Sequence, residues 1–264
     1  MGQNSSSLDM ATWKTEGFVL KRVPWKEYDG LYTLYTRENG KIIVRAQGIR
    51  KITSKLAGHC EPFMKSNFLL AQGKYWDQLA GSQIREAYPT LRTILSHLRT
   101  AQSLTHSLDT LTQEAQSDVR IYELLGDAFN FLNTIEKAAG TIWCFAYTWR
   151  WKLIAYLGYA PALDQCVAHK HIFRGQHFFD IQHGGIVCQK HINVSHSIAI
   201  TKTTLMLLEK ALQYPFQAMQ KEKATQQEWE LFGRIIDRFT GYHVPGHRKN
   251  RSTYQQLHKH QLYV

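Results

Sequence analysis

The sequence predicts an α+β protein, in which a small five-stranded β-barrel precedes an α-helical domain. Up to Tyr88, short apolar runs rich in β-branched and aromatic residues alternate with turn residues. From Pro89 onward, apolar residues recur at helical spacing instead. Two Cys-x2-His pairs interrupt this helical part. We therefore expect a barrel domain over residues 11–88 and a helical domain over residues 89–264, with an inserted hairpin at residues 163–193 and a basic tail.

The composition indicates a globular protein with a polyanionic partner. Of 264 residues, 44% are hydrophobic, and the formal net charge is +11. Nucleic acid is the commonest partner for such a charge, and an anionic membrane surface is the alternative. No apolar run reaches the length of a membrane span, and residues 1–10 lack the apolar core of a signal peptide. Four cysteines suit a reducing compartment, so we expect a cytoplasmic protein with no membrane partner and a disordered leader over residues 1–10.

Five strands are expected before Tyr88. They centre on residues 18–20, 31–35, 42–44, 63–70 and 74–84. Asn39-Gly40 predicts a type I′ turn between the second and third strands, because this dipeptide accepts the positive φ angles that the turn requires. Five short strands in this length are typical of a closed barrel of the OB kind.

A basic loop follows the third strand. From Trp13 to Lys65 the chain has eleven Lys or Arg and five acidic residues. The candidate nucleic-acid contacts here are Lys21, Arg22, Arg45, Arg50, Lys51 and Lys55. Aromatic residues lie among these charges, namely Trp25, Tyr28, Tyr32, Tyr35 and Phe63. Basic side chains follow phosphates while aromatic faces stack on bases, which is how OB barrels hold single strands. The alternative is a solvated loop, and for each single aromatic we expect a place in the barrel core.

Helical segments are expected from Pro89, a residue suited to the first helical position. Apolar spacing places them at residues 91–104, 119–135, 142–157, 204–212 and 226–239. The third is apolar on more than one face, so we expect a central buried helix that Gly158 and Pro161 end. The tail beyond Gly241 adds Arg248, Lys249 and Arg251 to the candidate nucleic-acid contacts, although a disordered solubilising end is the alternative.

The two Cys-x2-His pairs predict a zinc site. Cys166 and His169 form the first pair, and Cys188 and His191 the second, with eighteen residues between the pairs. Zn²⁺ takes four nitrogen or sulfur ligands in a tetrahedron, and two tight turns can supply them. We expect one structural ion. The alternative is a partly buried loop with free thiols and surface imidazoles, and the nearby substitutes His171, His177 and His183 break the paired spacing.

The sequence resembles the bacterial recombination mediator RecO family. In the first part the resemblance rests on Arg-Ala-Gln-Gly-Ile-Arg-Lys at residues 45–51, Ser-Lys-Leu-Ala-Gly at 54–58 and Glu-Pro-Phe at 61–63. In the second part it rests on residues 149–166, which run through Leu-Gly-Tyr and Pro into Cys166, and on Gly184-Gly185 before Cys188. The family's zinc-binding members use two Cys-x2-Cys pairs, whereas here His169 and His191 replace the second cysteine of each pair.

The resemblance implies a non-enzymatic function in DNA repair. RecO-like proteins bind single- and double-stranded DNA, anneal complementary strands and, with RecR, help to load RecA onto gaps covered by single-strand-binding protein. A nucleoid-associated protein is then expected, with DNA, RecR and single-strand-binding protein as partners. Two alternatives are an RNA-binding OB protein and a zinc-dependent hydrolase. Against the hydrolase, the sequence has no HExxH pattern, and Asp164 and Asp180 are isolated.

Overall fold

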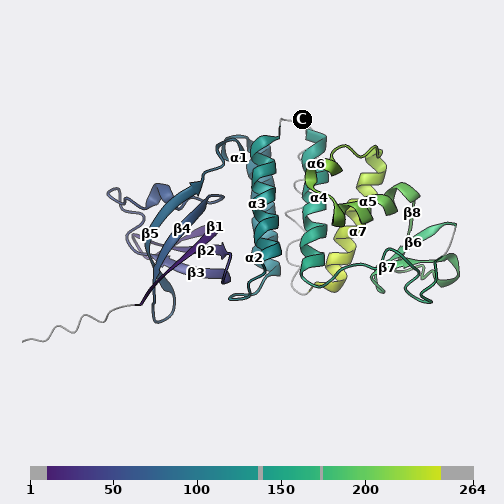
Figure 1. The fold of residues 1–264 in the computed structure, drawn as a ribbon, viewed down its shortest axis with the longest axis horizontal. Helices are drawn as coiled ribbons and strands as arrows, with labels where there is room; N and C mark the ends of the chain where they lie inside the picture. Colours follow the sequence, from purple (N-terminus) through teal and green to yellow (C-terminus); the bar gives the residue numbers. More distant parts are fainter. Residues whose placement is uncertain (1–10, 136–138, 173–174, 245–264) are drawn as a thin grey trace, which may run out of the picture. The chain divides into compact units, whose positions relative to one another are not determined.

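The computed structural model describes residues 11–135, 139–172 and 175–244, which form two compact units (Figure 1). A barrel unit contains the described residues up to Pro89 together with Gln113–Tyr122. A helical unit contains Thr90–Thr112 together with the described residues from Glu123 onward. The expected α+β class is confirmed, with the strands of the barrel preceding the helices.

Five strands close the barrel in the order β1-β2-β3-β5-β4 (Figure 1). The strands are β1 (Thr12–Trp25), β2 (Asp29–Thr36), β3 (Gly40–Ala46), β4 (Lys65–Ala71) and β5 (Asp77–Glu86). The long strand β1 pairs with β4 through its first half and with β2 through its second half. A short parallel pairing between β3 and β5 completes the ring. The expected five-stranded barrel is therefore confirmed.

The barrel core is filled from alternating positions of these strands. Val19, Leu34, Val44, Phe68 and Leu70 are almost wholly buried there, as alternation between the two faces of a strand requires. The aromatic expectation is correct for Tyr32 and Tyr35, which are buried.

The same expectation is wrong for Trp25 and Tyr28, whose exposed fractions are 38% and 46%. Trp25 lies in the part of β1 that pairs with β2 alone, and Tyr28 lies in the turn that follows, so neither has a second strand beside it.

The β2–β3 connection differs from the expected type I′ turn. Thr36 pairs with Gly40, which leaves a loop of three residues, and the positive φ of 64° falls on Gly40 after the turn. Such a loop, ending in a left-handed glycine, is the next most common hairpin connection. The Thr36 hydroxyl donates to the Gly40 carbonyl at 3.1 Å and accepts from the Asn39 N–H at 3.2 Å. The Asn-Gly signal thus located the hairpin but gave the wrong turn type.

Residues 113–122 pack against the barrel. The Ala115 N–H donates to the Lys41 carbonyl at 2.9 Å, and the Tyr122 hydroxyl donates to Glu16 at 2.6 Å. The Tyr122 ring lies 5.0 Å from that of Phe18. A Cβ atom on Gly40 would stand 2.0 Å from the carbonyl oxygen of Gln116, so this contact requires glycine at position 40.

The helical unit is built around α4 (Ala139–Tyr156). Trp149 and Trp151 are completely buried, and their indole N–H groups donate to the carbonyls of Leu124 and Leu208 at 3.2 and 3.0 Å. The expected central buried helix is therefore confirmed. The other helices are α1 (Pro89–Thr93), α2 (Leu95–Leu111), α3 (Val119–Thr134), α5 (Lys202–Gln213), α6 (Phe216–Met219) and α7 (Gln226–His243). The first expected helix is interrupted at Ile94, which has extended backbone angles, and the short α6 was not expected.

A small three-stranded sheet of order β7-β6-β8 replaces the simple hairpin that was expected. Its strands are β6 (His177–Asp180), β7 (Gly185–Val187) and β8 (Ser197–Ile200). The buried Asp180 carboxylate accepts from the His183 N–H at 2.9 Å and from the Ser197 hydroxyl at 2.7 Å, which ties the β6–β7 turn and the start of β8 together at one end of the sheet. Within the described ranges, no helix combines the length and apolar character needed to cross a bilayer.

We predict that Gly40→Ala destabilises the barrel unit. The added Cβ meets Gln116, and an L-residue at φ 64° is strained, so the combined cost is about 2 kcal/mol or more. Urea unfolding measures the loss. Gly58→Ala is the matched control, because a Cβ there has no heavy atom within 4 Å. Equal stability of the two variants would contradict the packing of residues 113–122 on the barrel.

Candidate metal centre and nucleic-acid interface

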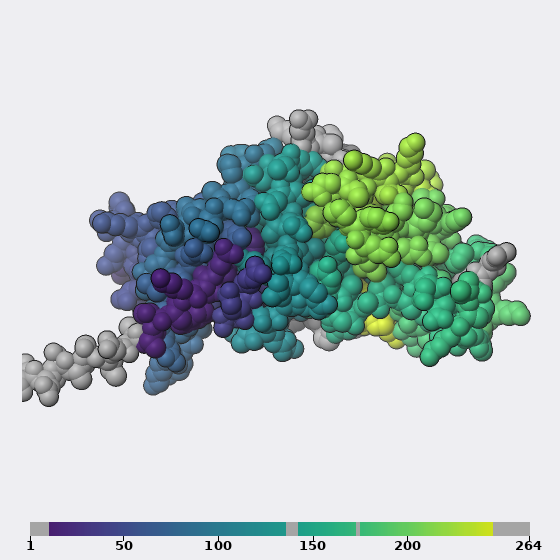
Figure 2. Space-filling view, in the orientation of Figure 1, coloured from purple at the N-terminus to yellow at the C-terminus, as the bar shows by residue number. Residues whose placement is uncertain are grey.

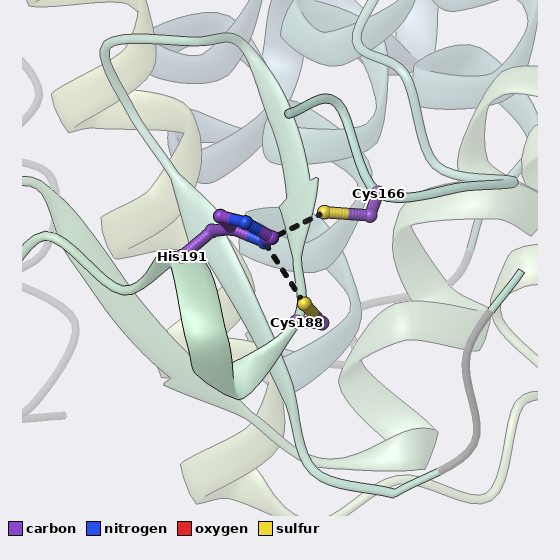
Figure 3. A group of neighbouring side chains, drawn as sticks. All are labelled: Cys166, Cys188 and His191. Atoms are coloured by element: carbon purple, nitrogen blue, oxygen red, sulfur yellow. Dashed lines mark hydrogen bonds between the residues drawn. The ribbon is translucent and has the colours of Figure 1, made fainter. Parts of the chain in front are cut away.

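Three side chains of the expected zinc site converge on one point (Figure 3). The sulfurs of Cys166 and Cys188 and a nitrogen of His191 all lie within 4.8 Å of one another. The Nδ1 atom of His191 lies 3.1 Å from the Cys188 sulfur and 3.8 Å from the Cys166 sulfur. Both cysteines are buried and His191 is half-buried, so the group opens to solvent on the histidine side.

Backbone hydrogen bonds bring the two cysteines together. The Ala162 N–H donates to the Gly184 carbonyl at 3.0 Å, and the Ile186 N–H donates back to the Ala162 carbonyl at 2.9 Å. Further along, the Val167 N–H donates to the Ile186 carbonyl at 2.9 Å. Residues 162–167 therefore run beside β7, and this pairing sets Cys166 next to Cys188. A Cβ on Gly185 would stand 2.3 Å from the Ala162 carbonyl oxygen, so the approach depends on glycine.

A tight turn follows each cysteine. After Cys166, the Lys170 N–H donates to the Cys166 carbonyl at 2.7 Å, and Lys170 has a positive φ of 50°. After Cys188, the 3₁₀ turn η2 (Gln189–His191) lets the His191 N–H donate to the Cys188 carbonyl at 2.9 Å. The second turn directs the cysteine and the histidine of its pair toward the same point, as the Cys-x2-His spacing predicted.

The surroundings favour the protonation states that a metal needs. Burial raises the pKa of Cys166, but N–H groups of Cys188, Ala168 and His169 that point at its sulfur outweigh burial and hold the pKa below its usual value. Burial, and then the neighbouring side chains of His169, His171 and Lys190, lower the pKa of His191. A thiolate and a neutral imidazole are the forms that bind Zn²⁺. This donor set fits the ion that the sequence suggested.

His169 lies next to this group without belonging to it. Its ring centroid is 4.1 Å from that of His191, and its side chain is exposed. The structure therefore assembles three of the four expected ligands and leaves the fourth beside them. Among the lower-ranked substitutes, the Nδ1 atom of His183 lies 2.9 Å from the Asp180 carboxylate, which directs that ring to the Asp180 side of the sheet.

In the basic loop, Asp29 organises the backbone. Its Oδ2 accepts from Nε and Nη2 of Arg45 at 3.0 and 2.6 Å, and its Oδ1 accepts from the Gly48 N–H at 2.8 Å. The Gly48 N–H and then Arg45 hold the pKa of Asp29 below its usual value. Arg45 is thus held in a half-buried ion pair and is less available to phosphates than the sequence suggested. Arg22 pairs with Glu61 at 2.5 Å, but this pair lies at the surface and the Arg22 side chain is 48% exposed.

The remaining candidate cations of the barrel lie at the surface. Arg50 joins the loop to the β1–β2 turn, because its Nη1 donates to the Glu27 carbonyl at 3.2 Å and its N–H to the Tyr28 carbonyl at 2.9 Å. The Lys51 ammonium stands 5.6 Å from the centre of the Tyr28 ring. Lys21 and Lys55 are also exposed. In Figure 2 the indigo atoms near residue 50 project from the surface of the barrel unit. Arg248, Lys249 and Arg251 lie outside the described residues.

The sequence analysis missed an aromatic group at the same end of the barrel. Trp76, in the β4–β5 loop, meets Trp25 edge to face with ring centroids 5.2 Å apart. Its neighbour Tyr75 is 81% exposed, and the Lys74 ammonium lies 5.4 Å above the Tyr75 ring. Residues 74–76 were expected to begin the fifth strand, which in fact starts at Asp77. The available signal was the aromatic pair Tyr75-Trp76, two residues after the turn residue Gly73.

Comparison with known proteins identifies the family. The family model described as "Recombination protein O N terminal" matches residues 10–88, and "Recombination protein O C terminal" matches residues 95–252. The chain belongs to the recombination protein O family.

Curated relatives in the recombination protein O family align along much of the chain. The protein of Pelotomaculum thermopropionicum is 28% identical over 89% of this chain and 90% of its own length. That of Bacillus pumilus is 34% identical over 67% of each chain, and that of Desulforamulus reducens is 24% identical over 96% of this chain and 98% of its own length. All three are named "DNA repair protein RecO". The resemblance stated from the sequence is therefore confirmed.

Proposed function

We propose that this protein is a recombination mediator that binds single- and double-stranded DNA through one face of its barrel. In this proposal it anneals complementary strands and, with RecR, helps to load RecA at gaps covered by single-strand-binding protein. Membership of a family whose relatives are named DNA repair proteins supports a function in DNA repair. The nucleoid-associated location expected from the sequence belongs to the same proposal.

The observation that carries the proposal is a stacking face, defined by Trp25, Tyr28, Tyr75 and Trp76 with the cations Arg50, Lys51 and Lys74. Within residues 11–88, the exposed large hydrophobic side chains are Val23, Trp25, Tyr28, Ile52 and Tyr75. All of them lie at the end of β1, in the turn after it, or in the β3–β4 and β4–β5 loops. In OB folds the loops between strands 1 and 2 and between strands 4 and 5 bind oligonucleotides. The edge-to-face contact of Trp25 and Trp76 joins the end of β1, where the first of these loops begins, to the second loop.

Such a face supports binding and annealing without any bond-making residue. Ammonium and guanidinium groups neutralise phosphates, while aromatic rings offer stacking partners to unpaired bases. A surface that neutralises phosphates also lowers the repulsion between two strands. Base pairing itself then drives annealing, so no nucleophile, general base or catalytic metal is required.

We assign a structural zinc ion to Cys166, Cys188 and His191, with His169 as the fourth ligand. The support is the convergence of the three donor atoms and the proximity of His169 to His191, whose tilted rings have centroids 4.1 Å apart. When bound, such an ion supplies rigidity, since four protein ligands leave no position for a reactive water. A zinc-dependent hydrolase therefore remains the weaker alternative.

We predict that replacing Arg50, Lys51 and Lys55 together by Ala weakens DNA binding and flattens its salt dependence. Each phosphate contact releases a counterion, so losing three contacts lowers the slope of log affinity against log salt by about 2 on single strands. Fluorescence anisotropy over a range of salt concentrations measures both effects. The control replaces the exposed residues Lys202, Lys221 and Lys223 of the helical unit, which removes the same charge. An equal loss in both triple variants would show that net charge, rather than this loop, governs binding.

We also predict that Tyr75→Ala weakens binding of single strands without changing the salt slope. Loss of one stacked base costs about 1–3 kcal/mol, while the phosphate contacts remain. Because Tyr75 is 81% exposed, its removal leaves the fold intact. Tyr214→Ala is the control, since Tyr214 is 48% exposed in the helical unit. Matched DNA and RNA strands are compared in the same assay, and a clear preference for RNA would favour the RNA-binding alternative.

For the metal, we predict one zinc ion per chain, retained at neutral pH and lost in acid. Protons compete for the two thiolates and for His191, so zinc affinity falls as pH falls. Elemental analysis after dialysis at several pH values measures this loss. We expect His191→Ala to abolish binding and His169→Ala to weaken it, because only His191 lies within the three-residue group. Metal-free wild-type protein, or full zinc content after joint Cys166→Ser and Cys188→Ser substitution, would refute the site.

A further inference from the structure

We propose that Cys166 and Cys188 are a redox-modification site, at which a hydroperoxide converts the pair to a disulfide and releases zinc. The inference rests on the zinc assignment in the proposed function. In it, a covalent bond takes over the structural role of the metal, so that the segment around Cys166 stays joined to the end of β7 in both states.

The first support is the proximity of the two sulfurs. They share a group whose donor atoms all lie within 4.8 Å, and the cysteines pack together with Val187 in one buried cluster. The segments that carry them are joined by the hydrogen bond from the Val167 N–H to the Ile186 carbonyl at 2.9 Å. A disulfide needs its two Cβ atoms about 4 Å apart, which neighbouring hydrogen-bonded segments readily provide. Rotation of the two side chains can therefore join the sulfurs while the backbone pairing is kept.

The second support is that each cysteine has a single partner. The chain has four cysteines, and the other two are Cys60, buried in the barrel core, and Cys144, on α4. Neither belongs to the group of donor atoms around His191. Oxidation of the site therefore has one disulfide product.

The third support is the presence of histidine in each Cys-x2-His pair. In a site with four cysteines, one disulfide would leave two thiolates for the ion. Here one disulfide removes both thiolates and leaves only imidazoles, whereas a structural zinc site requires four ligands. A single two-electron oxidation is thus sufficient to release the metal. The metal site is sensitive to a single oxidation because each pair contains one cysteine and one histidine, His169 or His191, in place of two cysteines.

The chemistry balances with a hydroperoxide as the oxidant. The Cys188 thiolate attacks the O–O bond, an S–O bond forms, and hydroxide or alkoxide leaves, which gives a sulfenic acid. The Cys166 thiolate then attacks this sulfur, the S–S bond forms, the S–O bond breaks, and a second hydroxide leaves. Each sulfur loses one electron and the peroxide gains two. The sulfurs no longer carry the negative charge that held the cation.

The two cysteines differ in access, which sets the order of attack. Cys188 is 7% exposed and sits beside the half-buried His191, whereas Cys166 is completely buried. A small peroxide therefore reaches Cys188 first, and Cys166 acts as the resolving thiol from the buried side. The sulfur of Cys166 is already adjacent to that of Cys188, so disulfide formation competes with further oxidation of the sulfenic acid.

The experiment treats the full-length, zinc-loaded protein with hydrogen peroxide. Zinc release is followed with a chromophoric chelator, free thiols are titrated, and alkylated peptides are mapped by mass spectrometry. We expect one zinc released for each pair of thiols lost, a peptide that joins Cys166 to Cys188, and recovery after dithiothreitol and zinc are added. Cys144→Ser should behave as the wild type. Cys188→Ser should form no such bond.

Three results would overturn the inference. They are retention of zinc after oxidation, a disulfide that uses Cys60 or Cys144, and conversion of Cys188 to sulfinic acid without a bond to Cys166. Because these results are read on the wild-type protein, they do not depend on the folding of any variant. Metal-free starting protein would refute the zinc assignment, and with it the metal-release part of the inference. Peptide mapping of that protein would then decide separately whether Cys166 and Cys188 form the disulfide.

Discussion

The barrel depends on the offset pairing of β1 with its two neighbours. Its first half pairs with β4, its second half with β2, and only the central residues near Gly17 and Phe18 pair on both sides. This overlap closes the sheet and buries residues such as Val19 and Leu20. The same offset leaves the end of β1 with one neighbour, so Trp25 stands outside the core and meets Trp76. Barrel closure and the exposure of an aromatic surface are thus two results of one strand register.

Much of the fold follows from local sequence, because most of its elements have strong periodic signals. The five strands, the buried α4 and the helical nature of the second unit were predictable from apolar spacing and turn residues. The type of the β2–β3 turn was not, because a dipeptide does not reveal which register places Thr36 opposite Gly40. The strand β8 was also missed, since Ser-Ile-Ala-Ile is too short to distinguish from a loop without its partner β6.

The metal group was more predictable than the nucleic-acid surface. Spacing alone selected Cys166, His169, Cys188 and His191, and three of these four side chains converge, because two residues between ligands fit a tight turn whatever the surrounding fold. Charge alone could not tell which cations are free, because Arg45 and Asp29 are sixteen residues apart in sequence and their pairing is a tertiary contact. The aromatic partner of Trp25 was hidden for the same reason, as it comes from a loop about fifty residues later.

The barrel unit is discontinuous in sequence, and this affects how it forms during synthesis. Its last strand ends at Glu86, but Gln113–Tyr122 also belong to it, and α2 is made in between. While the ribosome has released only the strands, Phe18 lacks its Tyr122 neighbour and the Lys41 carbonyl lacks the N–H of Ala115. The nascent barrel therefore reaches its final packing only after Tyr122 has left the exit tunnel. The stretch of chain that must be synthesised before the barrel can pack fully is therefore longer than the stretch that contains its five strands.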